Sequence, residues 1–598
     1  MGYQAPVDDM LLALKSAADF DRLAEAGVYD GLDEATVRAI LDEAGKFAAD
    51  VLDPLNWPGD RAGSTLVDGT VVTPPGWKEA YEAFVEAGWN ALPGSETYGG
   101  QGLPSIIASA VAEIWNSANL SFGLCPLLTQ GAIDALEATG SEELKALYLP
   151  NMISGRWTGT MNLTEPQAGS DLASLVTRAV PQPDGTYRLF GTKIYITYGE
   201  HELTENIIHF VLARLPNAPA GTKGISLFLV PKRLVNTDGS LGRRNDVVCA
   251  GVEHKLGIHA SPTCTMKYGE SGEGAVGYLV GEENKGLAAM FIMMNAARLA
   301  VGVQGVAVAE RATQRATAYA RERKQGRTHW NPKGEMAAII EHPDVRRNLM
   351  LMRALTLAAR GICFATAAAL DTAERSSDPA VKAAAAYRAA LLTPVAKAWS
   401  TDIGVEVASI GIQVHGGMGF VEETGAAQHF RDSRILPIYE GTNGIQAIDL
   451  AMRKLPLDGG GVVRAYLGEL RAVADEVRRV NAAEFGRTGD ILGEGVEALE
   501  RATGWMLARH KAGTGTDTDA LLASASPYLK LFGVVAGAGY VARAALAAYR
   551  DSSDAAEDAV AAARFFAKNV AVEAAGLARI VTESSDALLA VAPDRLSA

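Results

Sequence analysis

Glu440 lies between Tyr439 and Gly441 in the segment RDSRILPIYEGTNGIQ, residues 431–446. The residues just before it are mostly apolar, and the glycine after it lets the chain turn tightly past a ligand. Removal of a carboxyl group from water raises its pKa, which suits a general base. The pattern alone also fits an exposed loop glutamate or an acid at the start of a helix. Glu440 is therefore a candidate base whose role depends on other residues.

A second candidate is the segment NLTEPQAGSDL, residues 162–172. Its small residues let the backbone approach a flat ring closely, and the hydroxyl groups of Thr164 and Ser170 offer hydrogen bonds. Taken alone, these residues are explained more simply by a structural turn. Composition does not identify the ring that such a turn would face.

Three further patterns carry weaker information. The glycine-rich turn QVHGGMGF, residues 413–420, has no specific meaning alone. The run RERKQGR, residues 321–327, is typical of a solvated basic surface. Arg298 stands among apolar residues in MFIMMNAARLAVG, which indicates a buried partner for its charge.

The elements that must position these residues fall into four parts. Residues 1–155 are predicted to be helical, with apolar residues at helical spacing in 34–52 and 77–88 and a more apolar, buried stretch at 106–120. Turn residues break these helices at 92–104.

Residues 156–280 have a different character. Short runs rich in β-branched and aromatic residues, punctuated by glycine and proline, predict a small antiparallel sheet that ends near residue 278. The predicted strands cover residues 187–190, 193–197, 207–213 and 225–230.

The helical pattern returns at residue 286, and Ala-rich helices are predicted to about residue 454. The glycines at 459–461 predict a break, so the third part is 281–455 and the fourth is a further helical domain, 456–598, with a loop at 513–519. Runs of helices separated from a run of strands indicate the α+β class.

Composition limits the possible functions. The formal net charge of -15 and pI near 5.2 argue against a general polyanion-binding surface. No pair of the four cysteines forms a CxxC motif, so neither a zinc site nor a redox motif is indicated, and we expect no metal and four reduced thiols. The N-terminus lacks the pattern of a secretory signal, and no uninterrupted apolar stretch reaches about 20 residues. We therefore expect a soluble, cytoplasmic protein without a membrane span.

Two motifs of the β region resemble signatures of the acyl-CoA dehydrogenase family. TEPQAGSD, residues 164–171, resembles the segment that contacts the flavin, and GTKIYITYGE, residues 191–200, resembles the GxKxWITN strand. The resemblance implies bound FAD, with Thr164 and Thr197 as hydrogen-bonding partners of the flavin ring and Tyr195 as an aromatic wall in place of the usual tryptophan. It places Ser170 near the CoA part of the substrate.

The segment around Glu440 is similar to the family signature RDxRxxxIYEGTxxIQ. The resemblance implies that Glu440 removes the α-proton of an acyl-CoA thioester while the β-hydrogen leaves as hydride to the flavin. It also implies that the amide of the base and a flavin hydroxyl polarise the thioester carbonyl. Tyr439 and Gly441 are then expected at the substrate, and Thr442 at the cofactor.

The weaker patterns gain an interpretation from the same family. Gln413 and Gly417 match a QxxGGxGF segment that contacts the FAD pyrophosphate of a neighbouring subunit, and Arg323 matches an arginine at the same boundary. Asn295 and Arg298 match the helix that faces CoA and the catalytic pocket. Two positions depart from the family pattern: Asn295 replaces an acid, and Met161 replaces an aromatic residue beside the flavin.

The N-terminal segment, EHPDVRRNLM at 341–350 and the extra C-terminal helices resemble a subgroup of long bacterial members. That subgroup includes enzymes for 3-methylthiopropionyl-CoA, from dimethylsulfoniopropionate breakdown, and for ordinary fatty acyl-CoAs. The resemblance implies a short- to medium-chain acyl-CoA substrate, an electron-transfer flavoprotein as acceptor and a homodimer or a dimer of dimers.

Two alternatives remain within this fold. Some long relatives bind DNA through a basic C-terminal domain, whereas residues after 456 here are more acidic than basic, and we expect no nucleic-acid partner. Desulfinase-like relatives lack the glutamate base, which Glu440 supplies.

Overall fold

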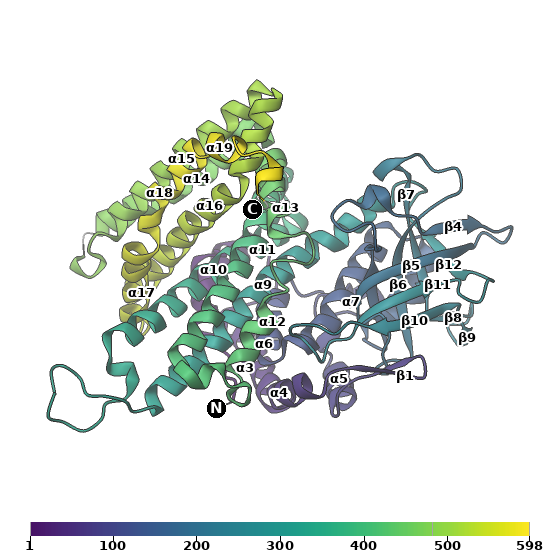
Figure 1. The fold of residues 1–598 in the computed structure, drawn as a ribbon, viewed down its shortest axis with the longest axis horizontal. Coiled ribbons are helices and arrows are strands. Elements are labelled where there is room, and N and C mark those ends of the chain that lie inside the picture. Colours follow the sequence, from purple (N-terminus) through teal and green to yellow (C-terminus); the bar gives the residue numbers. More distant parts are fainter. Residues whose placement is uncertain (1, 481, 597–598) are drawn as a thin grey trace.

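The computed structural model describes residues 2–480 and 482–596 and has the four predicted parts (Figure 1). N-terminal helices and a central helical bundle lie between the β domain on one side and the C-terminal helices on the other. The predicted α+β class is confirmed, because the strands between residues 157 and 280 are flanked by helices on both sides in sequence.

The N-terminal part is mainly helical, as predicted. Its helices are α1 (Val7–Ser16), α2 (Phe20–Glu25), α3 (Glu34–Phe47), α4 (Asp53–Ala62), α5 (Trp77–Glu86), α6 (Ser105–Ala118), α7 (Leu120–Thr139) and α8 (Glu142–Ile153). Helix α6 is buried almost all round, in agreement with its apolar sequence.

One hairpin in this part was not predicted. Strands β1 (Thr65–Val67) and β2 (Thr70–Val72) pair antiparallel around Asp68 and Gly69, which have φ values of 50° and 79°. Two central residues with positive φ are typical of the tight turns that join antiparallel strands, and Asp-Gly is a common sequence for them.

The β domain contains one large sheet with strand order β10-β11-β5-β12-β7-β6-β3. Most neighbours are antiparallel, as predicted, whereas β3 pairs with β6 in parallel. Strands β4 and β5 lie between β3 and β6 in sequence, and this long connection allows the parallel pairing. The strands are β3 (Trp157–Asn162), β4 (Arg178–Pro181), β5 (Tyr187–Thr197), β6 (Asn206–Arg214), β7 (Ile225–Pro231), β10 (Val247–Val252), β11 (Thr263–Tyr268) and β12 (Ala275–Val280), with a separate hairpin of β8 (Arg233–Val235) and β9 (Leu241–Arg244).

Strand β5 replaces the two predicted strands at 187–190 and 193–197. Its pairing with β11 shifts register between Lys193 and Ile196, so that two residues of β5 lie opposite one residue of β11. Tyr195 lies in this bulge and has a φ of 61°. A bulge turns a side chain out of the regular alternation, and the Tyr195 side chain is 61% exposed.

The central bundle is built from three long helices, α9 (Gly286–Glu322), α10 (Pro343–Arg375) and α11 (Pro379–His415), followed by the short helices α12 (Ala426–Ser433) and α13 (Asn443–Asp449). The core residues of these helices are continuous with those of the N-terminal and C-terminal helices. Glu440 lies in the turn between α12 and α13.

By length and composition, α9, α10 and α16 (Gly515–Arg550) could each cross a bilayer, although none contains an uninterrupted apolar stretch of about 20 residues. In this structure, 61%, 67% and 83% of their respective apolar windows are buried inside the protein. Helices that are apolar on most sides are typical of the core of a large helical assembly as well as of membranes.

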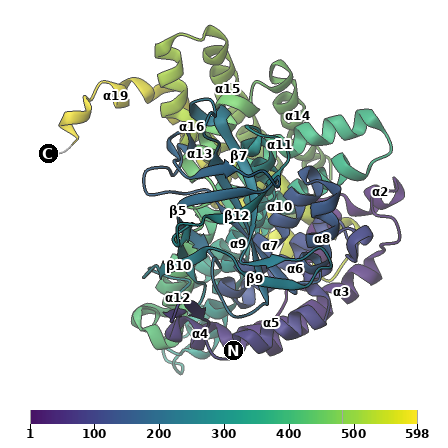
Figure 2. The same cartoon turned by 90° about the vertical axis from the view of Figure 1, so that its right-hand side faces the viewer.

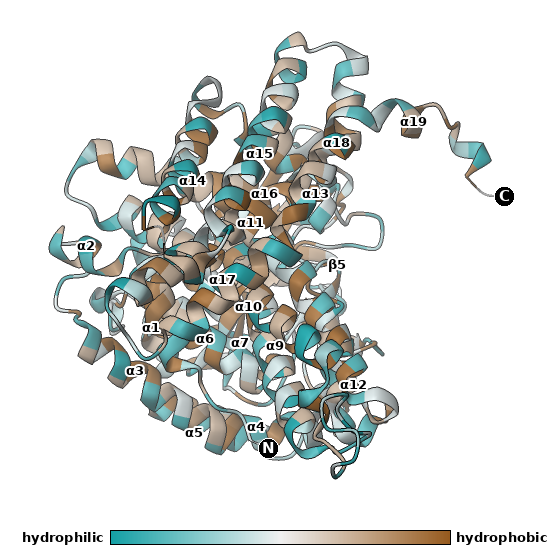
Figure 3. Ribbon diagram, turned by 90° about the vertical axis from the view of Figure 1, so that its left-hand side faces the viewer, coloured by the Kyte–Doolittle hydropathy of each residue, from teal (hydrophilic) through white to brown (hydrophobic). Residues whose placement is uncertain are grey.

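The C-terminal part consists of α14 (Gly461–Val480), α15 (Thr488–Ala512), α16, α17 (Ala556–Asn569), α18 (Ala574–Glu583) and α19 (Ser585–Leu589). The predicted loop at 513–519 is shorter than expected: the Thr514 side chain caps α16 by accepting a hydrogen bond from the Asp517 amide, so the helix begins at Gly515. The chain leaves the body of the protein at α19 (Figure 2). In Figure 3 the outer helices α3 and α5 carry both hydrophilic and hydrophobic residues.

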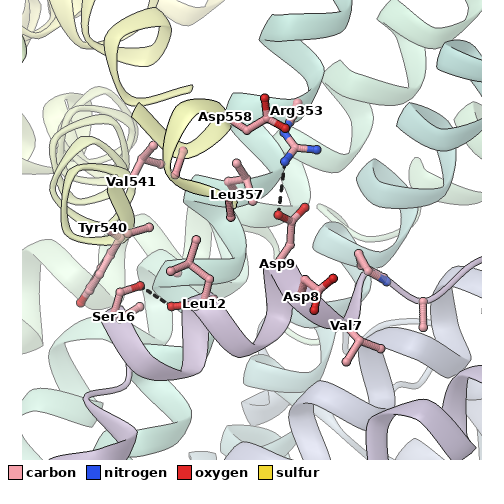
Figure 4. A pocket seen from close by; sticks show the side chains of 18 residues that line it. Val7, Asp8, Asp9, Leu12, Ser16, Arg353, Leu357, Tyr540, Val541 and Asp558 are labelled. Carbon is pink, nitrogen blue, oxygen red and sulfur yellow. Dashed lines mark hydrogen bonds and ion pairs between the residues drawn. The ribbon is translucent and has the colours of Figure 1, made fainter. Parts of the chain in front are cut away.

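The first helix joins the N-terminal part to the C-terminal part. Helix α1 packs against α10 and α16, and a cavity of about 430 Å³ lies between them (Figure 4). At its edge Arg353 pairs with Asp9 at 3.2 Å. None of the predicted site residues lines this cavity.

Candidate active site

Glu440 occupies a tight turn in a strained backbone conformation. Its φ is 54°, in the left-handed region that non-glycine residues rarely adopt, and Gly441 follows with a φ of 83°. This backbone conformation favours glycine at position 441, and a Cβ there would also lie 2.5 Å from Gln446 Nε2 and displace the end of that side chain. The turn is closed by the Asn443 amide, which donates to the Pro437 carbonyl at 2.9 Å.

Helix α13 starts directly after this turn. The Thr442 hydroxyl accepts a hydrogen bond from the Ile445 amide at 3.3 Å and so caps the helix. Thr442 was predicted to bind the cofactor, and the structure gives its side chain this capping role. The cap fixes the end of the Glu440 turn relative to the helix.

The charge environment of Glu440 suits proton transfer at neutral pH. Burial raises the pKa of its carboxyl to about 7, against the opposing effect of the positive charges of Arg298 on α9 and Lys397 on α11. Glu440 is partly buried, and Ile438 in its apolar flank is 50% exposed.

Arg298 has the buried partner that the sequence indicated. Its side chain lies 3.9 Å from Asp449 Oδ2, and both groups are almost fully buried. It also donates to Asn295 Oδ1 at 3.1 Å, and Asn295 is exposed. Within the described residues the Arg298 Nε atom has no hydrogen-bond acceptor, so this side chain keeps a donor for a further partner.

Tyr439 points into the bundle. Its hydroxyl donates to the side-chain oxygen of Gln304 on α9, and the Gln304 amide donates to Asn116 Oδ1 on α6 at 3.1 Å. Gln304 is fully buried. This hydrogen-bonded chain ties the residue before Glu440 to two helices of the core.

The two candidate flavin segments come together in the β domain. The Ile194 amide on β5 donates to the Thr164 carbonyl at 2.9 Å, which places the loop after β3 beside the Tyr195 bulge. Thr164 and Thr197 are partly buried, and neither hydroxyl has a hydrogen-bond partner among the described residues. Two hydroxyls without partners beside an exposed aromatic ring fit a polar, planar group such as a flavin.

A buried ion pair holds the same loop. Lys193 on β5 lies 2.8 Å from Glu165 Oε1, and Glu165 also accepts hydrogen bonds from the amides of Val176 and Thr177. The pair fixes the loop between β3 and β4 against β5.

Met161 lies in β3, and Ser170 lies in the loop between β3 and β4. Met161 is a buried residue of β3 and shares a core cluster with Met293 of α9. Met293 precedes Arg298 by about 7 Å along the helix, and α7 packs against both β3 and α9. Ser170 lies exposed on the loop and makes no hydrogen bond to the described residues.

The remaining predicted cofactor residues lie far from Glu440 within one chain. Arg323 follows the last turn of α9, about 25 residues beyond Arg298 and therefore about 37 Å further along the helix axis. Gln413 and Gly417 lie exposed at the end of α11. Stacking of Tyr319 on His415 places the ends of α9 and α11 side by side. Within one chain, Arg323, Gln413 and Gly417 therefore lie near one another and far from Glu440.

Several residues of the site were missed by sequence reasoning. Glu165, Lys193, Gln304 and Lys397 are buried polar residues that hold the two loops, and each stands in a stretch whose other residues are mostly small or apolar. A lone polar or charged residue in such a stretch is the one signal that the sequence offered. All four cysteines are free and buried, and no group of metal-ligating side chains occurs in the described part of the chain.

Comparison with known families assigns most of the chain. Models of the acyl-CoA dehydrogenase N-terminal, middle and C-terminal domains match residues 34–156, 160–270 and 284–455. A model described as acetyl-CoA dehydrogenase C-terminal like matches residues 466–592. The chain is 47% identical over 594 residues to the 3-methylmercaptopropionyl-CoA dehydrogenase of Ruegeria pomeroyi, covering 98% of this chain and 99% of the relative. The chain belongs to the acyl-CoA dehydrogenase family.

Other members of the acyl-CoA dehydrogenase family are less similar. A butyryl-CoA dehydrogenase of Syntrophomonas wolfei is 35% identical, covering 84% of each chain. The fold matches Caenorhabditis elegans ACDH-11 in complex with C11-CoA at a TM-score of 0.74 and 20% identity, over 93% of this chain and 92% of that one. It also matches a Bacillus anthracis acyl-CoA dehydrogenase complexed with FAD at 0.74 and 21% identity, over 96% and 91%. These matches confirm the predicted family and the long subgroup.

Proposed function

We propose that this acyl-CoA dehydrogenase is FAD-dependent, that Glu440 is its catalytic base, and that it converts a short acyl-CoA to the 2-enoyl-CoA. The observation that carries the proposal is the setting of Glu440: it is partly buried, it lies in a left-handed turn, and burial raises its pKa to about 7 in spite of the charges of Arg298 and Lys397. Such a group is half-ionised at neutral pH and can take up a proton.

Glu440 and Arg298 have separate roles in the removal of the α-proton. Glu440 removes the α-proton of the thioester. Among the described residues its own amide N–H has no hydrogen-bond acceptor, so it is free to donate to the thioester carbonyl oxygen and stabilise the charge that develops there. Arg298, with its spare donor, favours the ionised form of Glu440.

The β-domain residues would hold the FAD. Thr164 and Thr197 offer hydroxyls to the ring, Tyr195 gives an aromatic wall, and the Lys193–Glu165 pair keeps both segments in place. When bound, FAD supplies the acceptor for the β-hydrogen, which leaves as hydride. The separation of Arg323, Gln413 and Gly417 from this region supports a homodimer in which they face the pyrophosphate of a second subunit's FAD.

The substrate that we favour is 3-methylthiopropionyl-CoA, from the breakdown of dimethylsulfoniopropionate. The similarity to the Ruegeria pomeroyi enzyme over nearly the whole of both chains supports it. Butanoyl-CoA is the second candidate, supported by the Syntrophomonas wolfei relatives. We propose a cytoplasmic location and an electron-transfer flavoprotein as the acceptor; a solved structure described as an electron-transferring flavoprotein from Acidaminococcus fermentans matches the fold at a TM-score of 0.56.

One experiment tests the proposal. The purified protein is examined for flavin absorbance and then mixed with 3-methylthiopropionyl-CoA, butanoyl-CoA or octanoyl-CoA and a dye acceptor, with a Glu440→Gln variant in parallel. We expect bound FAD, the highest kcat/KM with the methylthio substrate and a loss of dye reduction in the variant. Absence of flavin, or equal activity of the variant, would contradict the proposal, and a higher kcat/KM with butanoyl-CoA would reassign the substrate.

A further inference from the structure

Lys397 is a fully buried lysine in the middle of α11. Its neighbours in sequence, VAKAWS, are apolar or small and are themselves buried. Burial of an ammonium group is costly unless hydrogen bonds or charges compensate for the lost water. Nevertheless, Lys397 forms no direct ion pair with any of the described carboxylates; its ammonium donates to Asn443 Oδ1 at 2.9 Å.

Asn443 connects this lysine to the turn of the base. It is the first residue of α13 and its amide closes the Glu440 turn on Pro437. Its side-chain NH₂ donates to the Ala398 carbonyl at 3.0 Å and to Asp402 Oδ1 at 2.7 Å. Because both of these partners are acceptors, the side-chain oxygen of Asn443 must face the ammonium group.

The charged groups that act on Lys397 and Glu440 come from several elements. Lys397 interacts with Glu440 of the turn, with Asp402 of its own helix and with Arg298 of α9. Glu440 interacts with the two cations Arg298 and Lys397. Arg298 in turn interacts with Asp449 and Arg453, so its charge is shared with a carboxylate that Lys397 does not face.

Protonation of Lys397 and Glu440 is linked. Burial lowers the pKa of the lysine to about 7, while Glu440 and Asp402 oppose the shift. The carboxyl of Glu440 has a pKa in the same range. Two groups that attract each other when charged favour one another's ionisation, so a charged lysine makes the ionised base easier to form.

We propose that Lys397 is a positioning residue for the reaction: held by Asn443, its ammonium group fixes the Glu440 turn on α11 and favours the ionised form of the base. The proposal rests on the role of Glu440 proposed above. It differs from a purely structural role, in which Lys397 would only fill space in the helix and its charge would not affect the reaction.

The test is the pH profile of kcat/KM for the flavin-loaded enzyme, compared between wild type and Lys397→Met. Methionine keeps the length and removes the charge. We expect the acidic limb of the profile to move to higher pH by about one unit, so that kcat/KM on that limb falls about tenfold. A variant with the wild-type limb and the wild-type kcat would overturn the proposal.

Lys530→Met is the matched control. Lys530 of α16 is exposed, and its charge acts on Asp402 without acting on Glu440. Its loss therefore removes a positive charge from the same neighbourhood, and we expect the acidic limb to stay in place. A shift as large as that of Lys397→Met would show a general effect of net charge and would also overturn the proposal.

Asn443→Ala is the second variant, and it tests the positioning role of Lys397 if Lys397→Met does not fold. It keeps the lysine and removes the group that holds it. We expect kcat to fall several-fold with little change in KM, together with a displaced acidic limb, and unchanged values of both would refute the positioning role. Glu440→Gln in the same assay separates the two proposals. Full activity in that variant would refute the role of Glu440 as the base. An inactive Glu440→Gln together with an unaffected Lys397→Met would refute only the role of the lysine.

Discussion

The Lys193 ammonium group lies 2.8 Å from Glu165 Oε1, and neither side chain is more than 1% exposed. Lys193 belongs to β5 and Glu165 to the loop after β3, so the pair joins the two segments that resemble flavin-contacting motifs. Burial raises the pKa of Glu165, but Lys193 and hydrogen bonds outweigh that effect and hold the pKa below its ordinary value. Burial lowers the pKa of Lys193 to about 8.

Replacement of Lys193 by methionine should therefore weaken both the fold and the cofactor site. It leaves the buried Glu165 carboxylate without its counter-charge, which costs roughly 3–5 kcal/mol. Urea unfolding of the flavin-loaded protein measures the loss, and flavin retention after gel filtration should fall in parallel. Lys267→Met is the control, because Lys267 on the adjacent strand β11 forms an exposed pair with Glu270 that contributes about 1 kcal/mol or less. Similar losses in the two variants would contradict the special role of the buried pair.

The activity of the wild type should rise with pH through about 7, the pKa of Glu440, because only the ionised carboxylate accepts the α-proton. Glu440→Gln should lower kcat by about 10²–10⁴-fold, in the range of general-base effects, with flavin content unchanged. Glu79→Gln, an exposed glutamate on α5, serves as the control and should retain full activity. A pH-independent kcat/KM between pH 5 and 9 would count against the assignment.

The raised pKa of the Glu440 carboxyl should lower the free energy of unfolding at high pH. Its pKa is raised from 4.5 to about 7 in the folded state, so the folded protein holds a proton that the unfolded chain has released. Stability therefore falls as pH rises from about 4.5 to 7 and stays lower above that range. Glu440→Gln removes this cost and should be more stable than wild type by up to about 3 kcal/mol at pH 8, with no such advantage at pH 4. Denaturant unfolding at both pH values measures the difference, which would be equal at the two if Glu440 were solvated.

The sequence predicted the site better where function depends on adjacent residues than where it depends on distant ones. Glu440, its apolar neighbours and the following glycine are contiguous, and their local conformation follows from residue types. The partner of Lys193 is 28 residues away, and that of Lys397 is 46 residues away. Such pairs depend on the register between a loop and a strand, or on the packing of two helices, which a local pattern does not contain.

Local patterns also misled in two places. Gly191 lies in the gap between the predicted strands 187–190 and 193–197, whereas the structure places it inside β5, where a Cβ would meet the Thr177 side chain at 2.4 Å. The glycine is thus required by close packing rather than by a turn. The Asp68-Gly69 hairpin lies in a part that was predicted to be helical, between the stretches of helical spacing at 34–52 and 77–88.

The Tyr439 hydroxyl anchors the residue before Glu440 to the buried core. Its hydroxyl donates to the buried carbonyl oxygen of Gln304, and Tyr439→Phe would leave that oxygen without a donor. We expect a loss of about 1–3 kcal/mol in the free energy of unfolding. Because this hydrogen bond also anchors Tyr439, the residue before Glu440, kcat should fall a few-fold as well. Urea unfolding and the dye assay measure the two effects.

A double variant distinguishes this hydrogen bond from simple loss of packing. Tyr439→Phe combined with Gln304→Leu removes both partners of this hydrogen bond. The donor to Asn116 Oδ1 is lost in Gln304→Leu with or without the second change. The double variant should therefore lose less stability than the sum of the two single variants. Strict additivity would show that the hydroxyl and Gln304 do not interact energetically. Tyr187→Phe, whose hydroxyl bonds to Glu283 at the surface at 3.0 Å, is the control and should change stability by about 0.5 kcal/mol or less. If Tyr439→Phe behaves like this control, the anchor from Tyr439 through Gln304 to Asn116 does not position the base.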